Sequence, residues 1–196
     1  MARTRRAVPV ELPPDASVRE RIMSTACRLF YDEGIQAVGI QRLIDEAGIA
    51  KASLYAHFPS KDDVVAAYLE RKGGEWRGEV QKHLDNPRLS ARAKILKIFD
   101  ITVAMVERPG FRGCPFHNAS AEVADPAHPI RVAAKQQRRW VQDVMSRLVR
   151  ETGAASPDRL VGSLMVLFDG ASATALIDGD PGSARNARWA AERMLA

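Results

Sequence analysis

The 196-residue sequence contains two cysteines, Cys27 and Cys114, and no long uninterrupted apolar segment. Two cysteines cannot form a disulfide framework or a four-cysteine zinc site, which is typical of proteins from reducing compartments. No run approaches the roughly 18 apolar residues of a membrane helix, and the arginine-rich start leads into Pro13 and Pro14 instead of an apolar signal segment. We therefore expect a soluble, cytoplasmic protein with no membrane partner.

Strand-like alternation and glycine-rich phosphate loops are also absent. Apolar residues recur at spacings of three and four, the period of amphipathic helices, and almost no segment alternates between apolar and polar residues. The sequence therefore predicts an all-α fold. The net charge of +5 is compatible with a polyanionic partner, but lysine and arginine are not concentrated in the first 61 residues, so charge alone does not indicate DNA.

Helix start and stop signals divide this pattern into separate segments. Ser17 and Glu20 have the spacing of a capping box, and Gly34 is a residue type that commonly ends a helix. Proline and glycine punctuate the rest of the chain in the same way. The predicted helices cover residues 17–34, 40–47, 51–58, 60 to beyond 76, 90–107, a short stretch after the loop at 111–114, 129–151, 157–178 and 180–195.

The second and third predicted helices are short, and Gly48 can supply the positive φ of a tight turn between them. Two such helices, braced by the helix before them, form a helix-turn-helix, whose second helix lies in the major groove of DNA. The sequence thus indicates a nucleic-acid interface within residues 40–58.

The second helix of this pair has an apolar face and a polar face. Leu54 and Phe58 are four residues apart and should face the core. The other positions carry small or hydroxyl-bearing side chains, at Ala52, Ser53, Tyr55 and Ala56. Small side chains let the backbone approach a groove, and hydroxyls can reach base edges or phosphates. We therefore expect this face to contact DNA, and a solvated helix within a bundle is the alternative.

Residues 16 to about 65, and in particular "LIDEAGIAKASLYAHFPSKDDVV", resemble the DNA-binding domain of the TetR family of transcriptional repressors. The resemblance implies a homodimer of roughly nine helices per chain, with an amino-terminal helix-turn-helix domain and a helical ligand-binding and dimerisation domain. With the arginine- and proline-rich start, it divides the chain into a flexible basic arm at residues 1–15, a helix-turn-helix DNA-binding domain at 16–62, and an effector-binding and dimerisation domain at 63–196.

The resemblance also assigns individual DNA-binding residues and implies a palindromic double-stranded operator. The residues that map onto the recognition helix are Lys51, Ala52, Ser53, Tyr55 and His57. Gln41 and Arg42 map onto the second helix, and Lys61 maps onto the phosphate-contacting lysine that follows the recognition helix. Gly39 departs from the pattern, because the family usually has Ser or Thr there to cap the second helix and touch phosphate.

The last two predicted helices are rich in small residues, which let helices approach closely. We expect them to form a two-fold four-helix interface, since a dimer reads two half-sites about 34 Å apart. The predicted interface residues are Leu160, Leu164, Leu167, Phe168, Ala171, Ala175, Ala191 and Met194. The alternative is that these residues form an intramolecular core.

An effector pocket is expected between these two ends of the chain. Thr102 and Gln137 interrupt otherwise apolar stripes, and a few polar groups in an apolar cavity are typical of a small-molecule site. Both could instead be hydrogen-bonded core residues. The predicted lining residues are Phe99, Thr102, Met105, Cys114, Phe116, His117, Asn118, Gln137 and Val141.

Several roles are open for Cys114, which lies in the unusual stretch "GCPFHNASAE". A nearby helix start and Arg112 would favour the thiolate, and the resemblance permits a thiol sensor of oxidants or electrophiles. A buried, inert cysteine is the simpler interpretation. A metal site with His117 and His128 has a weak pattern, because a second ligand pair is missing.

The predicted function is that of a dimeric, sequence-specific transcriptional repressor released from its operator by a small-molecule effector, with thiol-reactive compounds as one candidate class. The alternative is a helical enzyme or an interaction module that uses Cys114 and His117 without binding DNA. Nucleophilic catalysis would need an orienting group and an oxyanion site, which no spacing predicts. We expect no catalytic residue, metal or cofactor.

Overall fold

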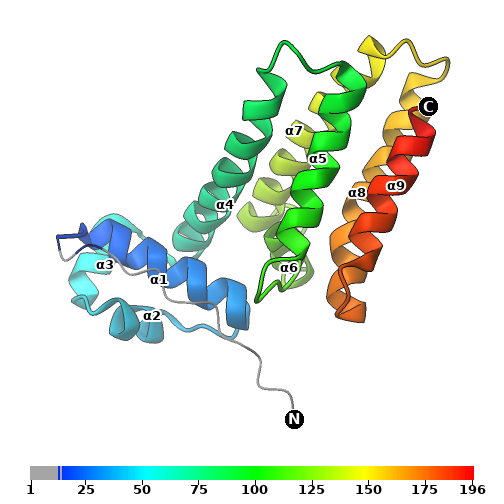
Figure 1. The fold of residues 1–196 in the computed structure, drawn as a ribbon. Helices are drawn as coiled ribbons and strands as arrows, with labels where there is room; N and C mark the ends of the chain where they lie inside the picture. The colour runs from blue at the N-terminus through cyan, green and yellow to red at the C-terminus, as the bar shows by residue number, and fades with distance from the viewer. Residues whose placement is uncertain (1–12, 14) are drawn as a thin grey trace. The chain divides into compact units, whose positions relative to one another are not determined.

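The computed structural model describes residue 13 and residues 15–196 (Figure 1). That part of the chain forms nine α-helices and no β-strand, which confirms the all-α prediction. The helices are α1 (Val18–Glu33), α2 (Ile40–Ala47), α3 (Lys51–His57), α4 (Lys61–Leu84), α5 (Ala91–Val106), α6 (Pro115–Ala121), α7 (Pro129–Glu151), α8 (Pro157–Asp178) and α9 (Gly182–Met194). The basic arm predicted for residues 1–15 lies almost wholly outside the described residues.

Local side-chain and backbone signals set the ends of the first helices. The Ser17 hydroxyl accepts a hydrogen bond from the Glu20 amide at 3.2 Å, as a capping residue does. The Glu20 carboxylate pairs with Arg71 of α4 at 2.5 Å. Gly48, with φ of 62°, separates α2 from α3 in the left-handed conformation that the sequence predicts for this turn.

By packing, the described chain forms two compact units. The first extends to residue 73 and includes residues 115–135, and the second consists of residues 74–114 and 136–196. Helices α4 and α7 each contribute to both units. The predicted boundary between residues 62 and 63 separates a DNA-binding domain from an effector-binding domain, and it stays a prediction. By packing, the amino-terminal unit also includes residues 115–135, which are distant in the sequence.

The core of the first unit is built mainly from α1, α2, α3 and the start of α4. Its fully buried side chains include Ile22, Leu43 and Leu54. Ala119, Val123 and Ile130 of the distant segment complete this core. That segment is also held by polar contacts, which come from Glu122. Its carboxylate accepts hydrogen bonds from the amides of Ile35 at 3.0 Å and Gln36 at 2.6 Å, in the connection between α1 and α2.

In the second unit, α5, α8 and α9 pack together, and Figure 1 shows α8 and α9 side by side. Ion pairs fasten α9 to α5, between Arg188 and Asp100 at 3.0 Å and between Arg185 and Glu107 at 2.7 Å. Burial alone would raise the pKa of Asp100. Hydrogen bonds from Lys97 and Arg188 together outweigh this effect, so that the pKa lies below its ordinary value. The two helices are thus joined by charges as well as by apolar packing.

Helix α8 is apolar for its length. It has 22 residues, and the mean hydropathy over 18 of them is 1.8, while 33% of that stretch is buried within the chain. By length and composition it could cross a membrane, contrary to the expectation that no segment comes near this threshold. Glycine, serine and the single charge of Asp169 interrupt its apolar run, so that inspection for uninterrupted apolar residues missed it.

Candidate DNA-binding surface

Helices α2 and α3 form a helix-turn-helix braced by α1. The Gly48 amide donates to the Asp45 carbonyl at 3.2 Å, and the Ile49 amide donates to the Ile44 carbonyl at 3.3 Å, which closes α2. The guanidinium of Arg21, on α1, donates to the Gly48 carbonyl at 2.5 Å. A Cβ at Gly48 would lie 2.8 Å from Arg21 Nη2, so a side chain there would displace the Arg21 guanidinium from the turn. The Gly48 turn and its contact with Arg21 therefore help to set the position of α3 relative to α1 and α2.

Helix α3 presents the two faces that the sequence predicts. Leu54 is 0% exposed and Phe58 is 4% exposed, so both lie in the core. The Tyr55 side chain is 42% exposed. The other residues predicted on this helix to contact DNA are the exposed Lys51, Ala52 and His57 and the half-buried Ser53. The geometry brings these residues to one outward surface, and their contacts with DNA stay a prediction.

Two further predicted contacts lie at the edges of this surface. Gln41 on α2 is exposed, and its amide nitrogen donates to Asp45 at 2.9 Å. Lys61 is half-buried at the first turn of α4. Ser60 precedes it, and its hydroxyl accepts from the Asp63 amide at 3.2 Å and donates to the Asp63 carboxylate at 2.6 Å. This arrangement caps α4 and holds Lys61 next to the end of α3.

Arg42, the remaining predicted contact, forms ion pairs with carboxylates of its own chain. Its guanidinium donates to Glu33 of α1 at 2.7 Å and to Glu46 of α2 at 2.9 Å, and Arg28 donates to the same Glu46 at 2.5 Å. Hydrogen bonds to Glu33 and Glu46 raise the pKa of Arg42, and those from Arg28 and Arg42 lower the pKa of Glu46. A contact between Arg42 and DNA would require the guanidinium to exchange a carboxylate for a phosphate. In this structure Arg42 joins α1 to α2.

Two more residues lie near this surface. Gly39 departs from the family pattern, and Arg19 was not among the predicted contacts. Gly39 occupies the N-cap position of α2 without a side-chain hydrogen bond, and a Cβ there would meet nothing within 4 Å. Arg19, exposed on α1, places its guanidinium carbon 5.2 Å from the centroid of the Phe58 ring. No sequence signal links Arg19 to Phe58, because the contact depends on how α1 crosses the end of α3.

Half of the predicted dimer-interface residues are buried within their own unit, and the assignment as a whole stays a prediction. Leu164, Ala171, Ala175 and Ala191 are between 0% and 3% exposed, so a second chain could not reach them directly. Phe168 packs on Trp76, with ring centroids 5.6 Å apart. The residues that are partly buried against the same core are Leu160, Leu167 and Phe168. Only Met194 of the predicted set, at 39%, is exposed. The apolar stripe chosen from the sequence is the face that α8 and α9 turn toward their own unit.

A different set of apolar side chains is exposed on α8 and α9. Val166 is 71% exposed and Ile177 is 82% exposed, and both lie on the outer face of α8. On α9, Trp189 is 59% exposed, with the Arg193 guanidinium 5.6 Å from its ring centroid. Side chains of this size are rarely left in water together in a monomer. These residues, with Leu176 and Met194, are called the α8–α9 outer face below.

The polar residues predicted to line an effector pocket are bonded within the protein. The Thr102 hydroxyl donates to the Ile98 carbonyl at 3.0 Å, and the Gln137 carbonyl oxygen accepts from Arg77 at 2.6 Å. Both residues are buried and hydrogen-bonded, as the alternative expects, and their place in an effector pocket stays a prediction. Of the other predicted lining residues, Phe99 and Val141 are buried, Met105, Cys114, Phe116 and Asn118 are half-buried, and His117 is exposed.

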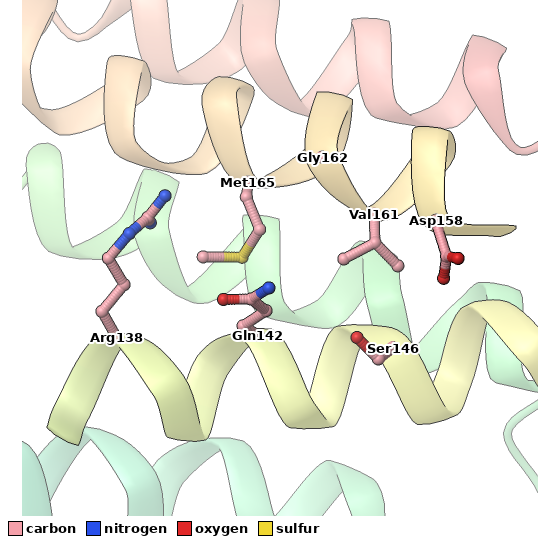
Figure 2. Close-up of a pocket in the computed structure, with 7 residues that line it drawn as sticks. All are labelled: Arg138, Gln142, Ser146, Asp158, Val161, Gly162 and Met165. Atoms are coloured by element: carbon pink, nitrogen blue, oxygen red, sulfur yellow. The ribbon is translucent and has the colours of Figure 1, made fainter. Parts of the chain in front are cut away.

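A cavity in the second unit lies elsewhere, between α7 and α8 (Figure 2). Its volume is about 270 Å³, and its lining residues are Arg138, Gln142, Ser146, Asp158, Val161, Gly162 and Met165. Figure 2 shows the Met165 side chain extending toward Gln142 across the gap between the two helices. None of the predicted pocket residues lines this cavity, and Arg138 at its edge pairs with Asp169 of α8.

A metal site with Cys114, His117 and His128 is not formed within the described residues, which contain no group of three or more His, Cys, Asp or Glu placed to hold a metal ion. The His128 ring has other partners. Its Nδ1 accepts from the Ile130 amide at 3.3 Å, and its Nε2 lies 3.4 Å from the Asp62 carboxylate. This histidine therefore orders the start of α7.

Comparisons with known proteins agree with this architecture. Residues 22–68 match the family described as "Bacterial regulatory proteins, tetR family", and residues 91–191 match "Tetracyclin repressor-like, C-terminal domain". The chain is 28% identical over 146 residues to the transcriptional repressor KstR2 of Mycolicibacterium smegmatis, covering 73% of this chain and 70% of KstR2. It is 31% identical over 140 residues to the transcriptional activator FasR of the same organism, covering 69% of this chain and 62% of FasR.

A solved structure gives the same result for the fold. The crystal structure of a TetR-family transcriptional regulator from Streptomyces coelicolor superimposes with a TM-score of 0.85 at 36% sequence identity, covering 91% of this chain and 94% of that one. The second family match alone extends over more than half of the chain. The chain belongs to the TetR family of bacterial transcriptional regulators.

Proposed function

We propose that the protein is a homodimeric, sequence-specific DNA-binding repressor of transcription that acts in the cytoplasm and is released from its operator by a small-molecule effector. The observation that carries this proposal is the outward face of α3, where polar and small side chains are exposed while Leu54 and Phe58 are buried beneath them. Family membership supports the same role. The exposed face has no evident use within the chain.

The chemistry of this face suits the major groove. Ala52 leaves space for the backbone to approach and offers a methyl group to thymine, while Ser53 and Tyr55 offer hydroxyl groups to base edges or phosphates. Lys51 and Lys61 lie at either end and can neutralise phosphates. His57 can donate from the side of the helix. In this arrangement base contacts come from the centre of α3, and phosphate contacts come from its margins.

A second copy of this chain is the occupant that we propose for the α8–α9 outer face. Val166, Ile177 and Trp189 are large apolar side chains that are each more than half exposed, and burying them would contribute roughly 1.5–3 kcal/mol per side chain. A two-fold pair of α8 and α9 helices would cover them and would present two α3 helices to adjacent turns of the groove. A lipid surface is the competing occupant, since α8 has the length and hydropathy of a membrane helix.

Release by an effector follows from population shift. A ligand that binds more tightly to a conformation with misplaced α3 helices lowers the DNA affinity by the ratio of its two affinities. The cavity between α7 and α8 supports a site for a small polar ligand within the second unit. A reactive thiol at Cys114 is the other candidate sensor, and conversion of Cys114 to Ser would abolish a response to electrophiles if that sensor operates.

The test is a selection of bound sequences from random duplex DNA by the full chain, followed by titration of the selected duplex and a scrambled one in a salt series. Recovery of a palindromic sequence, preferred over the scrambled duplex with a steep salt dependence, is the expected result. Failure to enrich any sequence would overturn the proposal. Transcription in vitro from a promoter carrying the selected site then distinguishes repression from activation, a distinction raised by the likeness to both KstR2 and FasR.

A further inference from the structure

The cationic side chains of the first unit differ in whether they are already held by oxygen atoms of the protein. The held arginines are Arg21, Arg28, Arg42, Arg71 and Arg131, each hydrogen-bonded to a carboxylate or to a backbone carbonyl. Arg19 differs from all of them, because no carboxylate or carbonyl within the described residues is bonded to its guanidinium. Its described contact is the Phe58 ring, 5.2 Å from the guanidinium carbon to the ring centroid.

This contact holds the guanidinium in place without using its N–H groups. A planar cation over an aromatic face is attracted by the ring quadrupole, so that the five N–H donors of arginine remain available at the edges. The Phe58 platform is itself rigid. Its side chain is 4% exposed, and its amide donates to the Leu54 carbonyl at 2.8 Å. Arg19 is thus an exposed cation that is positioned by an aromatic ring and that has no carboxylate partner in the part of the chain that the structure describes.

The platform also places Arg19 beside the proposed DNA-binding surface. Phe58 directly follows α3, the proposed recognition helix, and three residues later Lys61 begins α4. The guanidinium therefore lies against the residue that joins the proposed base-reading helix to the proposed phosphate-contacting lysine.

We propose that Arg19 is a phosphate-contacting residue of this DNA-binding surface, held ready by its stacking on Phe58. The proposal rests on the proposed function, since it presupposes that α3 lies on DNA. A guanidinium can donate two parallel hydrogen bonds to phosphate oxygens. When it neutralises a phosphate without first leaving a carboxylate, the release of counterions from DNA contributes in full to the affinity. Arg42, in contrast, must first give up an internal carboxylate. Arg19 therefore supplies a guanidinium contact for which no ion pair among the described residues has to break.

The experiment measures binding of four variants of the full chain to two duplexes across a potassium chloride series. The duplexes are the fluorescein-labelled sequence selected by the wild type and a random sequence of equal length. Arg19→Ala removes the cation and its stem, Arg19→Met keeps an apolar stem over Phe58 without charge, and Arg19→Lys keeps the charge. Arg159→Ala is the matched control, because Arg159 is also an exposed arginine in the first turn of a helix, in the second unit.

We expect Arg19→Ala and Arg19→Met to lower the slope of log affinity against log salt by about 0.9 per bound protomer. Near 0.1 M salt, the affinity should fall roughly fivefold to tenfold per protomer on both duplexes, because phosphate contacts carry no sequence information. Arg19→Lys should keep most of the slope, and Arg159→Ala should leave it unchanged. Circular dichroism and thermal unfolding establish that each variant is folded.

Two results would overturn the proposal. The first is an unchanged slope in Arg19→Met and Arg19→Ala, which would make Arg19 a structural staple of α1 on α3. The second is an equal loss of slope in Arg19→Lys and Arg19→Met, because loss of charge could then not be the cause. Failure of the proposed function is distinguishable from both, since the wild type would then select no sequence.

Discussion

At the scale of single residues, Gly39 and Tyr55 are two positions of the helix-turn-helix whose side chains can be tested separately. Gly39 lacks a capping side chain, and Tyr55 carries an exposed hydroxyl. Gly39 begins α2 in an extended conformation that any residue can adopt, with φ of −74° and ψ of 156°, but it offers no side-chain acceptor to the free amides of that helix. Tyr55 has the opposite character, because it is a large side chain kept in solvent on α3. Each residue can be changed without disturbing the core.

Replacement of Gly39 by serine should stabilise the protein. Serine would accept a hydrogen bond from the first turn of α2 and would reduce the freedom of the unfolded chain, which together contribute about 0.5–1 kcal/mol to the free energy of unfolding. Urea unfolding of Gly39→Ser and Gly39→Ala separates the two effects. Alanine reduces chain freedom equally but cannot cap, so it should be about 1 kcal/mol less stable than serine. Equal stability of the two variants would show that no cap forms.

Removal of the predicted DNA donors should weaken DNA binding while the fold is kept. We expect Tyr55→Phe to reduce the affinity for the selected duplex about tenfold, as the loss of one hydrogen bond to a charged group does. Lys61→Ala should lower both the affinity and the salt slope. Lys82→Ala is the control, since Lys82 is an exposed lysine of α4 within the second unit. An interaction module without DNA, or an enzyme, would show no difference among these three variants.

At the scale of helices, the turn between α2 and α3 depends on one backbone conformation and one arginine. Gly48 has φ of 62°, and its carbonyl is held by Arg21 of α1. The polar network of Arg42, Glu33 and Glu46 fastens the same two helices on exposed sides of α1 and α2. The orientation of α3 is therefore set within the protein, by the turn and its arginine together with the burial of Leu54 in the core of the first unit.

The variant Gly48→Ala tests this dependence. A left-handed alanine costs about 1–2 kcal/mol, and its Cβ would lie 2.8 Å from Arg21 Nη2, so urea unfolding should show a loss of at least that size and the DNA affinity should fall. Gly162→Ala is a matched control, because a Cβ at this exposed α8 position meets nothing within 4 Å. Helix propensity predicts that Gly162→Ala stabilises the protein by up to about 1 kcal/mol. Similar stability of the two variants would contradict the argument.

At the scale of the whole molecule, the α8–α9 outer face is the proposed dimer interface. Val166→Asp places a charge on this face, and we expect it to convert the dimer to a monomer in sedimentation equilibrium and to weaken binding to a palindromic duplex. Val132→Asp is the matched control, because Val132 is 40% exposed on α7 and is not part of the α8–α9 outer face. If both variants remain dimers, the face is not the interface. Flotation of the wild type with lipid vesicles, lost in Val166→Asp, would instead identify lipid as the occupant.

Sequence reasoning succeeded where neighbours within one helix decide the outcome. The burial of Leu54 and Phe58, and the exposure of Tyr55, follow from the helical period alone. It does not identify which helix packs on an apolar face. The stripe through Leu164, Ala171 and Ala175 is apolar at the right spacing for an interface, but α5 and α9 of the same chain cover it. Periodicity identifies residues that share a face and does not identify what packs on that face.

The amino-acid sequence by itself determined the helices, their order and the helix-turn-helix, because caps, turns and amphipathic periods act over a few residues. Only the tertiary structure decided the partners. Arg42 lies among carboxylates, Arg19 stacks on Phe58, and Glu122 holds the amide of Ile35. The last contact joins residues that are 87 positions apart in the chain. Such contacts depend on how helices cross, and no local pattern carries that information, so the availability of each charge for DNA emerges only in the folded protein.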